Sequence, residues 1–282
     1  MSKITIITDS TAYIPEALCA QYHITMLPQI LIWGDETFRD GVDIQPADFY
    51  QRLANASVMP TSSQISPGTF QDAFQQALDA GHEVLAVLIS QKLSGTLASA
   101  TQARQAFPAD APIEIVDSHS TAMAMGFQAL QAARAIEQGA SLQEARQIIE
   151  RSRAHSGVIF TPETLEFLHR GGRIGGASRL LGTAFNIKPI LDLNDGHIEP
   201  LEKVRTFKRA QQRLLEIVDE RAQGAPIHIG VIHANVPDKA EALLAEIRQR
   251  LNVVEDMVVP VSPVIGTHVG PGTVGITYLI EA

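Results

Sequence analysis

Hydroxyl-bearing residues follow three apolar segments of the sequence, at places where a strand would end and a helix begin. Ligands of an open parallel sheet lie outside the carboxyl ends of its strands, where hydroxyls and the N–H groups of helix starts can hold an anion. We therefore expect a site for a small carboxylate or phosphate at this edge. The segments and their polar turns are residues 3–8 with Asp9, Ser10 and Thr11, residues 83–89 with Ser94, Gly95 and Thr96, and residues 113–116 with Asp117 and Ser118.

The segment 266–272 has the sequence GTHVGPG and places His268 among three glycines and a proline. Glycine permits a close approach of the backbone to a ligand. The imidazole of His268 could then donate to a carboxylate, with help from Thr267. A purely structural histidine is the other interpretation, and the sequence leaves both open.

Ser94 has three interpretations. It can bind an anion together with the N–H groups of Gly95 and Thr96, or it can simply cap the following helix, as serine often does. A catalytic serine in a nucleophile elbow is the third, but that motif needs glycine two residues earlier, where Lys92 stands.

Two further polar groups are ambiguous. Asp9 resembles a phosphatase-type nucleophile after a first strand, yet Thr11 occupies the position of the second acid, and Asp9 could instead cap a helix. The run from Thr61 through Ser62 and Ser63 to Gln64 could close over a ligand. Loops rich in Ser and Thr are common, so this run alone does not define a site.

Composition limits the class of protein. The chain has 282 residues, of which 45% are hydrophobic and 19% charged, as in an ordinary globular protein rather than a disordered one. A single cysteine, Cys19, excludes an internal disulfide and a cysteine metal cluster. The nine histidines lack metal-ligand spacing, so we expect no metal and no cofactor. No apolar run reaches the ~20 residues of a membrane helix, and no signal sequence is evident. We expect a cytoplasmic protein.

The charge is unevenly distributed. The net charge of −9 argues against nucleic-acid binding, but residues 168–209 carry eight Lys or Arg against four acids. We call this stretch the basic island. It could dock an acidic or phosphorylated partner, or it could be an ordinary solvated surface.

The order of segments with strand-like and helix-like spacing of apolar residues predicts an α/β fold. A parallel sheet covered by helices is expected up to about residue 155, followed by an α+β domain with a mixed sheet, which gives domains 1–155 and 156–282. Asn194, Asp195 and Gly196 predict a hairpin turn. The expected strands are 3–8, 24–32, 83–89, 113–117, 157–160, 188–193, 197–205, 227–233, 253–261 and 274–280. The expected helices are 14–22, 46–54, 67–80, 95–106, 120–138, 141–154, 162–170, 178–186, 206–222 and 237–251.

Several of these segments together resemble the DegV family, bacterial fatty-acid-binding proteins of the FakB type. The resemblance extends from residue 8 to residue 275 in the order of the family, and the last two segments are its most specific part. The segments are TDSTAYIP, FRDGVDI, SSQISPGTF, LSGT, VDS, TLEFLHRGGRIGGASRLLGTAFNIKPIL and PVIGTHVGPGTVG.

The resemblance implies a two-domain carrier that is not an enzyme. It would hold one long-chain fatty acid, such as palmitate, stearate or oleate, in an apolar tunnel between the domains, and present the carboxylate to a fatty-acid kinase that forms the acyl phosphate for phospholipid synthesis. Carried over by position, the carboxylate ligands would be Ser62, Ser94, Thr267 and His268, which are hydroxyls and a histidine without an arginine. Thr61, Ser63, Gly95 and Ser10 are secondary candidates, and Arg170 and Arg173 would face the kinase. The alternative from the residues is a hydrolase or phosphotransferase using Ser94 or Asp9.

Overall fold

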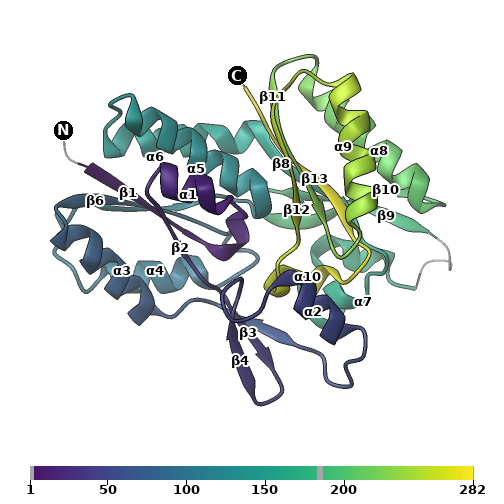
Figure 1. The fold of residues 1–282 in the computed structure, drawn as a ribbon, viewed down its shortest axis with the longest axis horizontal. Helices are drawn as coiled ribbons and strands as arrows, with labels where there is room; N and C mark the ends of the chain where they lie inside the picture. The colour runs from purple at the N-terminus through teal and green to yellow at the C-terminus, as the bar shows by residue number, and fades with distance from the viewer. Residues whose placement is uncertain (1–2, 183–186, 282) are drawn as a thin grey trace.

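The computed structural model describes residues 3–182 and 187–281. A parallel sheet and a mixed sheet lie beside one another in this part of the chain, and helices cover both (Figure 1). This arrangement confirms the predicted α/β fold. A continuous cluster of buried apolar side chains joins the two sheets, and includes Ile6 and Leu85 of the first and Phe160 and Leu191 of the second.

The parallel sheet has helices on both faces. Alternate residues of its central strand β6 feed different apolar clusters, with Leu85 and Val87 on one face and Val84 and Ala86 on the other, as the two-residue period of a strand requires. In spatial order the strands are β2 (Ile24–Leu27), β1 (Lys3–Asp9), β6 (His82–Leu88) and β7 (Ile113–Asp117). The helices are η1 (Ser10–Ala12), α1 (Glu16–Gln21), α3 (Pro67–Asp79), α4 (Thr96–Arg104), α5 (Ala122–Glu137), α6 (Leu142–Ser152) and η2 (Arg153–His155).

Two of the predicted helix starts are confirmed. Ser66 accepts a hydrogen bond from the N–H of Thr69 at the start of α3. Ser141 and Glu144 form a capping box at the start of α6. Such caps satisfy N–H groups that the helix itself leaves unpaired.

The mixed sheet has its strands in the order β10, β9, β8, β13, β11 and β12. Neighbours are antiparallel except β11 and β12. The predicted hairpin joins β9 to β10, with Asp195 and Gly196 both at positive φ, as a type I′ turn requires. The strands are β8 (Ser156–Thr161), β9 (Lys188–Asn194), β10 (His197–Val204), β11 (Ile227–His233), β12 (Val253–Pro260) and β13 (Val274–Ile280). The helices of this half are α7 (Glu166–Arg170), η3 (Gly175–Leu180), α8 (Phe207–Ala222), α9 (Pro237–Arg250) and α10 (Pro263–Val269).

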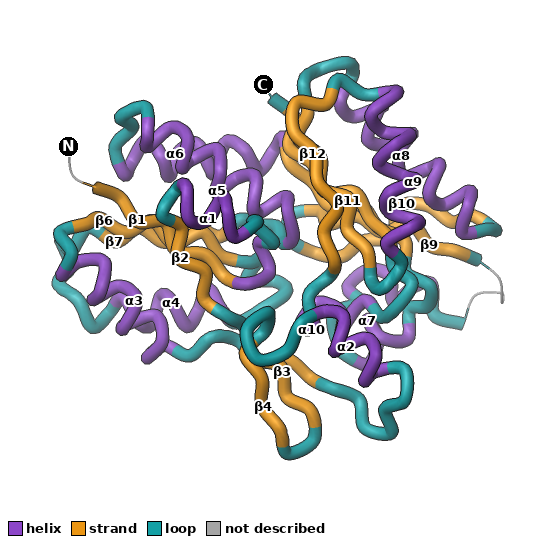
Figure 2. Tube along the Cα trace, in the orientation of Figure 1, coloured by secondary structure: helices purple, strands orange, loops and turns teal. Residues whose placement is uncertain are grey.

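Helix α5 lies between the two sheets (Figure 2). It contacts β1 and β6 of the parallel sheet and β8, β11 and β13 of the mixed sheet. Every residue from Ala122 to Leu130 is buried, and an apolar surface on all sides is expected of a helix enclosed in this way.

The predicted strand 24–32 was wrong. The chain leaves β2 at Leu27 and starts a separate strand after Pro28 and Gln29, because proline has no N–H to donate to a ladder. The second strand belongs to a small antiparallel sheet whose other two strands the sequence did not predict. This sheet consists of β4 (Glu36–Arg39), β3 (Ile30–Trp33) and β5 (Thr61–Ser63). Helix α2 (Pro46–Leu53) lies between β4 and β5 in the sequence.

Three other boundaries differ from the sequence prediction. The expected helix 162–170 is helical only over α7. Only part of the expected helix 178–186 overlaps the short 3-10 helix η3, and its residues 183–186 lie outside the described residues. The sequence prediction had no helix over 263–269, where the structure has α10.

Candidate functional site

A pocket lies between the carboxyl edge of the parallel sheet and the mixed sheet. Turns after β1, β6 and β7 contribute Thr11, Ile89 and Thr121, and the mixed sheet contributes Phe160 and Ile232. The cavity volume of the pocket is about 80 Å³. Most of its lining is aliphatic or aromatic: Ile89, Leu93, Ala122, Val158, Phe160, Leu168, Leu193, Ile198, Ile232, Val261, Val264, Ile265 and Val269.

The polar part of the lining is built around Ser62 and His268. The Oγ atom of Ser62, on β5, lies 2.7 Å from Nε2 of His268, on α10. Helix α10 reaches this position because Gly266 lets it pack against α2. A Cβ at Gly266 would come within 2.6 Å of the hydroxyl of Tyr50. The sequence-predicted candidates Ser62 and His268 are thus brought together from segments 206 residues apart.

Ser94 is the second polar element of the lining. It precedes α4, and its hydroxyl lies 2.8 Å from Oγ1 of Thr96. Thr96 in turn exchanges hydrogen bonds with the side-chain amide of Gln29. Neither Ser94 Oγ nor its partner Thr96 contacts a histidine or a carboxylate through any hydrogen bond among the described residues, so Ser94 lacks the adjacent base that an activated nucleophile has.

Arg173 connects these two polar elements. Its Nε donates to the carbonyl of Leu93, next to Ser94, and its Nη1 donates to the carbonyl of Gly171. Gly171 packs against the imidazole so closely that a Cβ there would lie 2.1 Å from Nδ1 of His268. Arg173 also lines the pocket, so an arginine lies beside the hydroxyls and the histidine expected there.

The imidazole of His268 is held neutral. Burial, and secondly the positive charge of Arg173, lower its pKa to about 4. Within the described part of the chain, Nδ1 is buried and has no hydrogen-bond partner. One nitrogen of a neutral imidazole donates and the other accepts, so Nδ1 carries the N–H when Nε2 accepts a hydrogen bond from Ser62.

The remaining candidate residues lie in the pocket lining, in an adjoining cavity or beside a lining residue. Ser63 contributes to its lining. Thr61 and Thr267 line an adjoining cavity instead, and the hydroxyl of Thr267 donates to the carbonyl of Pro263. Gly95 packs against the side chain of Gln64, which lines the pocket.

Ser10 and Asp9 belong to the buried framework behind the pocket. Ser10 donates to Asp40 at 2.7 Å and accepts from the N–H of Gln29. Asp9 is fully buried and accepts hydrogen bonds from both the N–H and the hydroxyl of Thr11 and from the N–H of Ile89. Neither residue is in the pocket lining, so Asp9 is placed to stabilise the strand ends and not to attack a bound substrate.

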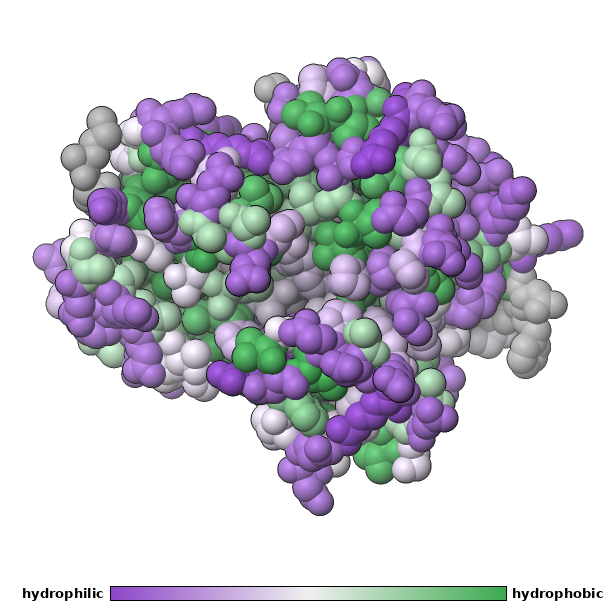
Figure 3. Space-filling model, in the orientation of Figure 1, coloured by the Kyte–Doolittle hydropathy of each residue, from purple (hydrophilic) through white to green (hydrophobic). Residues whose placement is uncertain are grey.

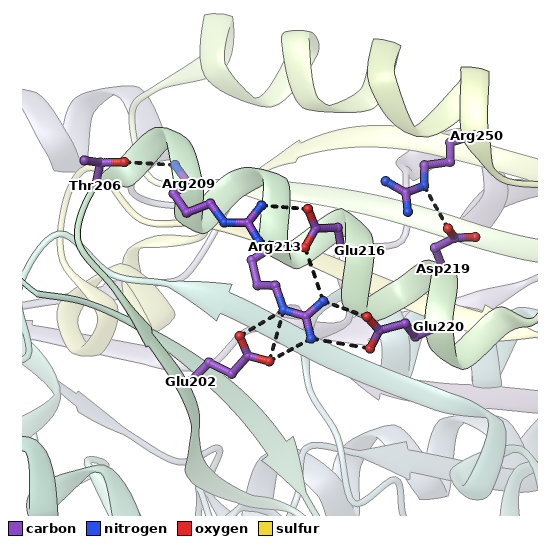
Figure 4. Close-up of polar contacts among 8 residues, drawn as sticks. All are labelled: Glu202, Thr206, Arg209, Arg213, Glu216, Asp219, Glu220 and Arg250. Atoms are coloured by element: carbon purple, nitrogen blue, oxygen red, sulfur yellow. Dashed lines mark hydrogen bonds and ion pairs between the residues drawn. The ribbon is translucent and has the colours of Figure 1, made fainter.

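Half of the cations of the basic island form ion pairs with nearby acids. Arg170 pairs with Glu166, and three further cations pair in the same way. Several of these acids lie outside residues 168–209. The net charge counted over residues 168–209 is therefore more positive than the net charge of the surface around them. Figure 4 shows the pairing along α8, where Arg209 meets Glu216. The other two pairs are Arg179 with Glu199 and Lys188 with Glu163.

Arg170 and Arg173 nevertheless border the site. Both line the cavity that adjoins the pocket, together with Thr61, Ser62 and His268. Ser62, Arg173 and His268 line the pocket as well and so separate the two spaces. A charged partner at this cavity would be next to the polar part of the pocket.

The described residues contain no group of three His, Cys, Asp or Glu side chains arranged to hold a metal ion. No helix in residues 3–182 or 187–281 is long and apolar enough to cross a membrane. The face drawn in Figure 3 is largely hydrophilic, with hydrophobic residues scattered over it.

The chain is similar to members of one protein family over nearly its whole length. The family model described as "Uncharacterised protein, DegV family" matches residues 3–281. The chain belongs to the DegV family. A DegV domain-containing protein of Streptomyces coelicolor is 39% identical over 97% of both chains, and protein DegV of Bacillus subtilis is 33% identical over 99% of this chain and 100% of its own.

Two solved DegV family structures superpose closely. The fatty acid-binding protein of Thermus thermophilus is 35% identical, covers 99% of this chain and 100% of its own, and has a TM-score of 0.94. DegV of Bacillus subtilis, also described as a fatty acid-binding protein, is 32% identical over the full length of both chains, with a TM-score of 0.91.

The sequence analysis missed Gln29 at this DegV site and gave the hydroxyls of Thr11 and Thr96 no individual role. Gln29 and Thr11 line the pocket, and Thr96 orients Ser94. Gln29 follows a strand end at Pro28, and recognising that break would have placed it beside the other strand-end residues. Thr11 and Thr96 were named among the polar turn residues, but the contacts of their hydroxyls depend on the fold.

Proposed function

We propose that this protein binds one long-chain fatty acid, such as palmitate, stearate or oleate, with its acyl chain in the pocket and its carboxylate at Ser62, Ser94 and His268. The observation that carries the proposal is the composition of the pocket. A mostly apolar lining is combined with a cluster of hydroxyls and one imidazole, and solved relatives with the same fold are fatty acid-binding proteins.

The energetics support this ligand. Burial of roughly 15 methylene groups at about 0.8 kcal/mol each gives on the order of 12 kcal/mol before the cost of association. A carboxylate next to this apolar lining requires several donors, because it would otherwise be protonated. Ser62, Ser94 and His268 supply neutral donors, while Arg173 contributes a positive charge whose own N–H groups are partly committed to carbonyls.

The proposal extends to a kinase partner. The cavity lined by Arg170 and Arg173 meets the pocket at Ser62 and His268, and so offers a route by which a fatty-acid kinase could reach the bound carboxylate. In this proposal the chain is a cytoplasmic carrier for phospholipid synthesis, and the kinase performs the phosphoryl transfer. Arg170→Glu should weaken kinase-dependent acyl phosphate formation without changing fatty acid affinity. Arg179→Glu, in the basic island but not in this cavity, is the matched control.

A hydrolase is the second candidate, because Ser62 and His268 lie within the reach of a nucleophile and its base. Two features oppose it. A general base works best with a pKa near the operating pH, whereas that of His268 is lowered to about 4. No carboxylate among the described residues orients Nδ1 of His268.

Mass spectrometry of the organic extract from natively purified protein tests the proposal. A stoichiometric long-chain fatty acid is expected, with rebinding after delipidation. Protein that carries no lipid and binds neither oleate nor palmitate would refute it. Turnover of a p-nitrophenyl ester that disappears in both Ser62→Ala and His268→Ala would favour the hydrolase.

A further inference from the structure

Two pocket-lining residues have a buried side-chain atom without a hydrogen-bond partner among the described residues. One is His268, whose Nδ1 lies at the proposed carboxylate end. The other is Thr121, which also lines the pocket and whose Oγ1 is buried. A buried hydroxyl without a partner is unfavourable, and the lost hydrogen bond is regained if a ligand supplies a polar atom.

Thr121 lies in the connection from β7 to α5, which is a different segment from those that carry Ser62, Ser94 and His268. The same connection meets the β9–β10 hairpin. Nδ1 of His119 lies 2.8 Å from Oδ1 of Asp195, and Leu193 and Ile198 of the hairpin line the pocket. The lining beside Thr121 in sequence is Ala122, which is apolar. The hydroxyl is therefore a polar group next to lining residues that would suit an acyl chain.

The local backbone keeps this hydroxyl available. Thr121 occupies the N-cap position of α5, where threonine usually accepts a hydrogen bond from an N–H of the first turn, yet it makes no such bond. The next residue, Ala122, has φ of 52°, a left-handed conformation that is unfavourable for a residue with a Cβ. Strain of this kind persists only where the surrounding structure imposes it, and it often occurs at binding sites.

Thr273 provides the internal comparison. It is also a buried threonine in the pocket lining, but its hydroxyl donates to the carbonyl of Val269 at 2.9 Å. Its polarity is therefore satisfied within the protein, whereas that of Thr121 is not.

From these observations we infer that Thr121 is a specificity-determining residue for acyl chains that carry an oxygen substituent. This inference rests on the proposed fatty acid ligand. A hydroxyl or keto group at the matching carbon would exchange a hydrogen bond with Oγ1, whereas a saturated chain leaves that atom unpaired.

The test compares the affinities of delipidated wild type, Thr121→Val, Thr121→Ser and Thr273→Val for stearate and for a panel of monohydroxystearates with the hydroxyl at different carbons. The measured quantity is the ratio of the Kd of stearate to that of each hydroxy acid. At one position or a few neighbouring ones, Thr121→Val should lower this ratio roughly tenfold, the effect of about one buried hydrogen bond. Thr121→Ser should retain the wild-type ratio, and Thr273→Val should leave it unchanged.

An equal ratio in wild type and Thr121→Val across the whole panel would overturn the inference, with stearate binding still supporting the proposed function. A preference for a cis-monounsaturated acid that Thr121→Val removes, without any effect on the hydroxy acids, would also overturn it. Failure of the wild type to bind any acid would instead refute the proposed function. Retention of stearate binding by Thr121→Val shows that this variant is folded.

Discussion

The imidazole of His268 and the hydroxyl of Ser62 lie 2.7 Å apart, although β5 and α10 are far apart in the sequence. This hydrogen bond joins the small antiparallel sheet to the helix that closes the pocket. It also fixes the ring whose other nitrogen is buried and unpaired among the described residues. A ligand carboxylate that enters here meets a pair of groups already oriented by one another, which lowers the cost of ordering them on binding.

Removal of either polar element should weaken fatty acid binding. Ser94→Ala and His268→Ala each delete a proposed donor to the carboxylate, and hydrogen bonds to charged groups contribute about 1.5–3 kcal/mol. We expect Kd to rise by roughly 10- to 100-fold, measured by isothermal titration calorimetry with palmitate. Ser10→Ala is the control, because Ser10 binds Asp40 behind the pocket. Wild-type affinity in both test variants would show that the carboxylate lies elsewhere.

The charge state of His268 should respond to the ligand. In the free protein its pKa is lowered to about 4, first by burial and second by Arg173. A bound carboxylate favours the imidazolium, so the pKa should rise on loading. NMR titration of the imidazole with and without a bound acid measures both values. Equal values in the two states would place the carboxylate away from this ring.

The same depressed pKa predicts how stability depends on pH. An unfolded histidine takes up a proton below about 6.5, while His268 in the folded protein resists protonation down to about 4. The unfolded state therefore binds more protons within this window, and the free energy of unfolding falls as pH falls from 6.5 to 4. His268→Gln should reduce this slope, as measured by urea unfolding at several pH values. An unchanged slope would contradict the assignment.

Gly171 and Gly172 allow a matched test of how the imidazole is positioned. A Cβ at Gly171 would lie 2.1 Å from Nδ1 of His268, whereas one at Gly172 meets no atom within 4 Å. Gly171→Ala should therefore displace the ring and weaken fatty acid binding at least tenfold. Gly172→Ala should cost about 1–2 kcal/mol of stability, because Gly172 has φ of +68°, but should leave the affinity nearly unchanged. Equal affinities of the two variants would refute this role of Gly171.

The sequence predicted the parallel sheet and the hairpin because local signals specify them. Alternation of strands and helices, the Ser66 and Ser141 caps, and the Asn194–Gly196 turn each depend on residues that are close in sequence. Two strands of the small sheet, β4 and β5, carried no such signal. β4 and β5 are only four and three residues long, and each pairs with β3 alone, so their existence depends on tertiary context.

The site was predicted in part for a similar reason. Ser62, Ser94 and His268 belong to recognisable segments, and the structure brings them to one pocket. The contribution of Arg173 and Gly171 to this environment depends on the fold of a segment after α7 that sequence periodicity does not specify. Gln29 was hidden by the assumption of one continuous strand through Pro28. Residue type indicated the chemistry of the site, but long-range packing decided which side chains meet in the pocket.

Asp9 should affect stability and not ligand binding. Three donors converge on its carboxylate, from the N–H and hydroxyl of Thr11 and the N–H of Ile89. Asp9→Ala leaves them buried without that acceptor, and we expect a loss of about 3 kcal/mol in the free energy of unfolding. Asp9→Asn keeps one acceptor oxygen and should lose less.

The pH dependence of the free energy of unfolding gives a second test of this role of Asp9. Burial raises the pKa of Asp9 above its ordinary value of 3.8, so the folded protein holds this proton more tightly than the unfolded chain does. The associated stability is fully present below 3.8 and is lost as pH rises through the folded pKa. Asp9→Asn has no such loss, and relative to wild type it should be more favourable at pH 7 than at pH 4 in urea unfolding. Palmitate affinity should stay at the wild-type level in Asp9→Asn, and a large loss of affinity there would mean that Asp9 contacts the ligand after all.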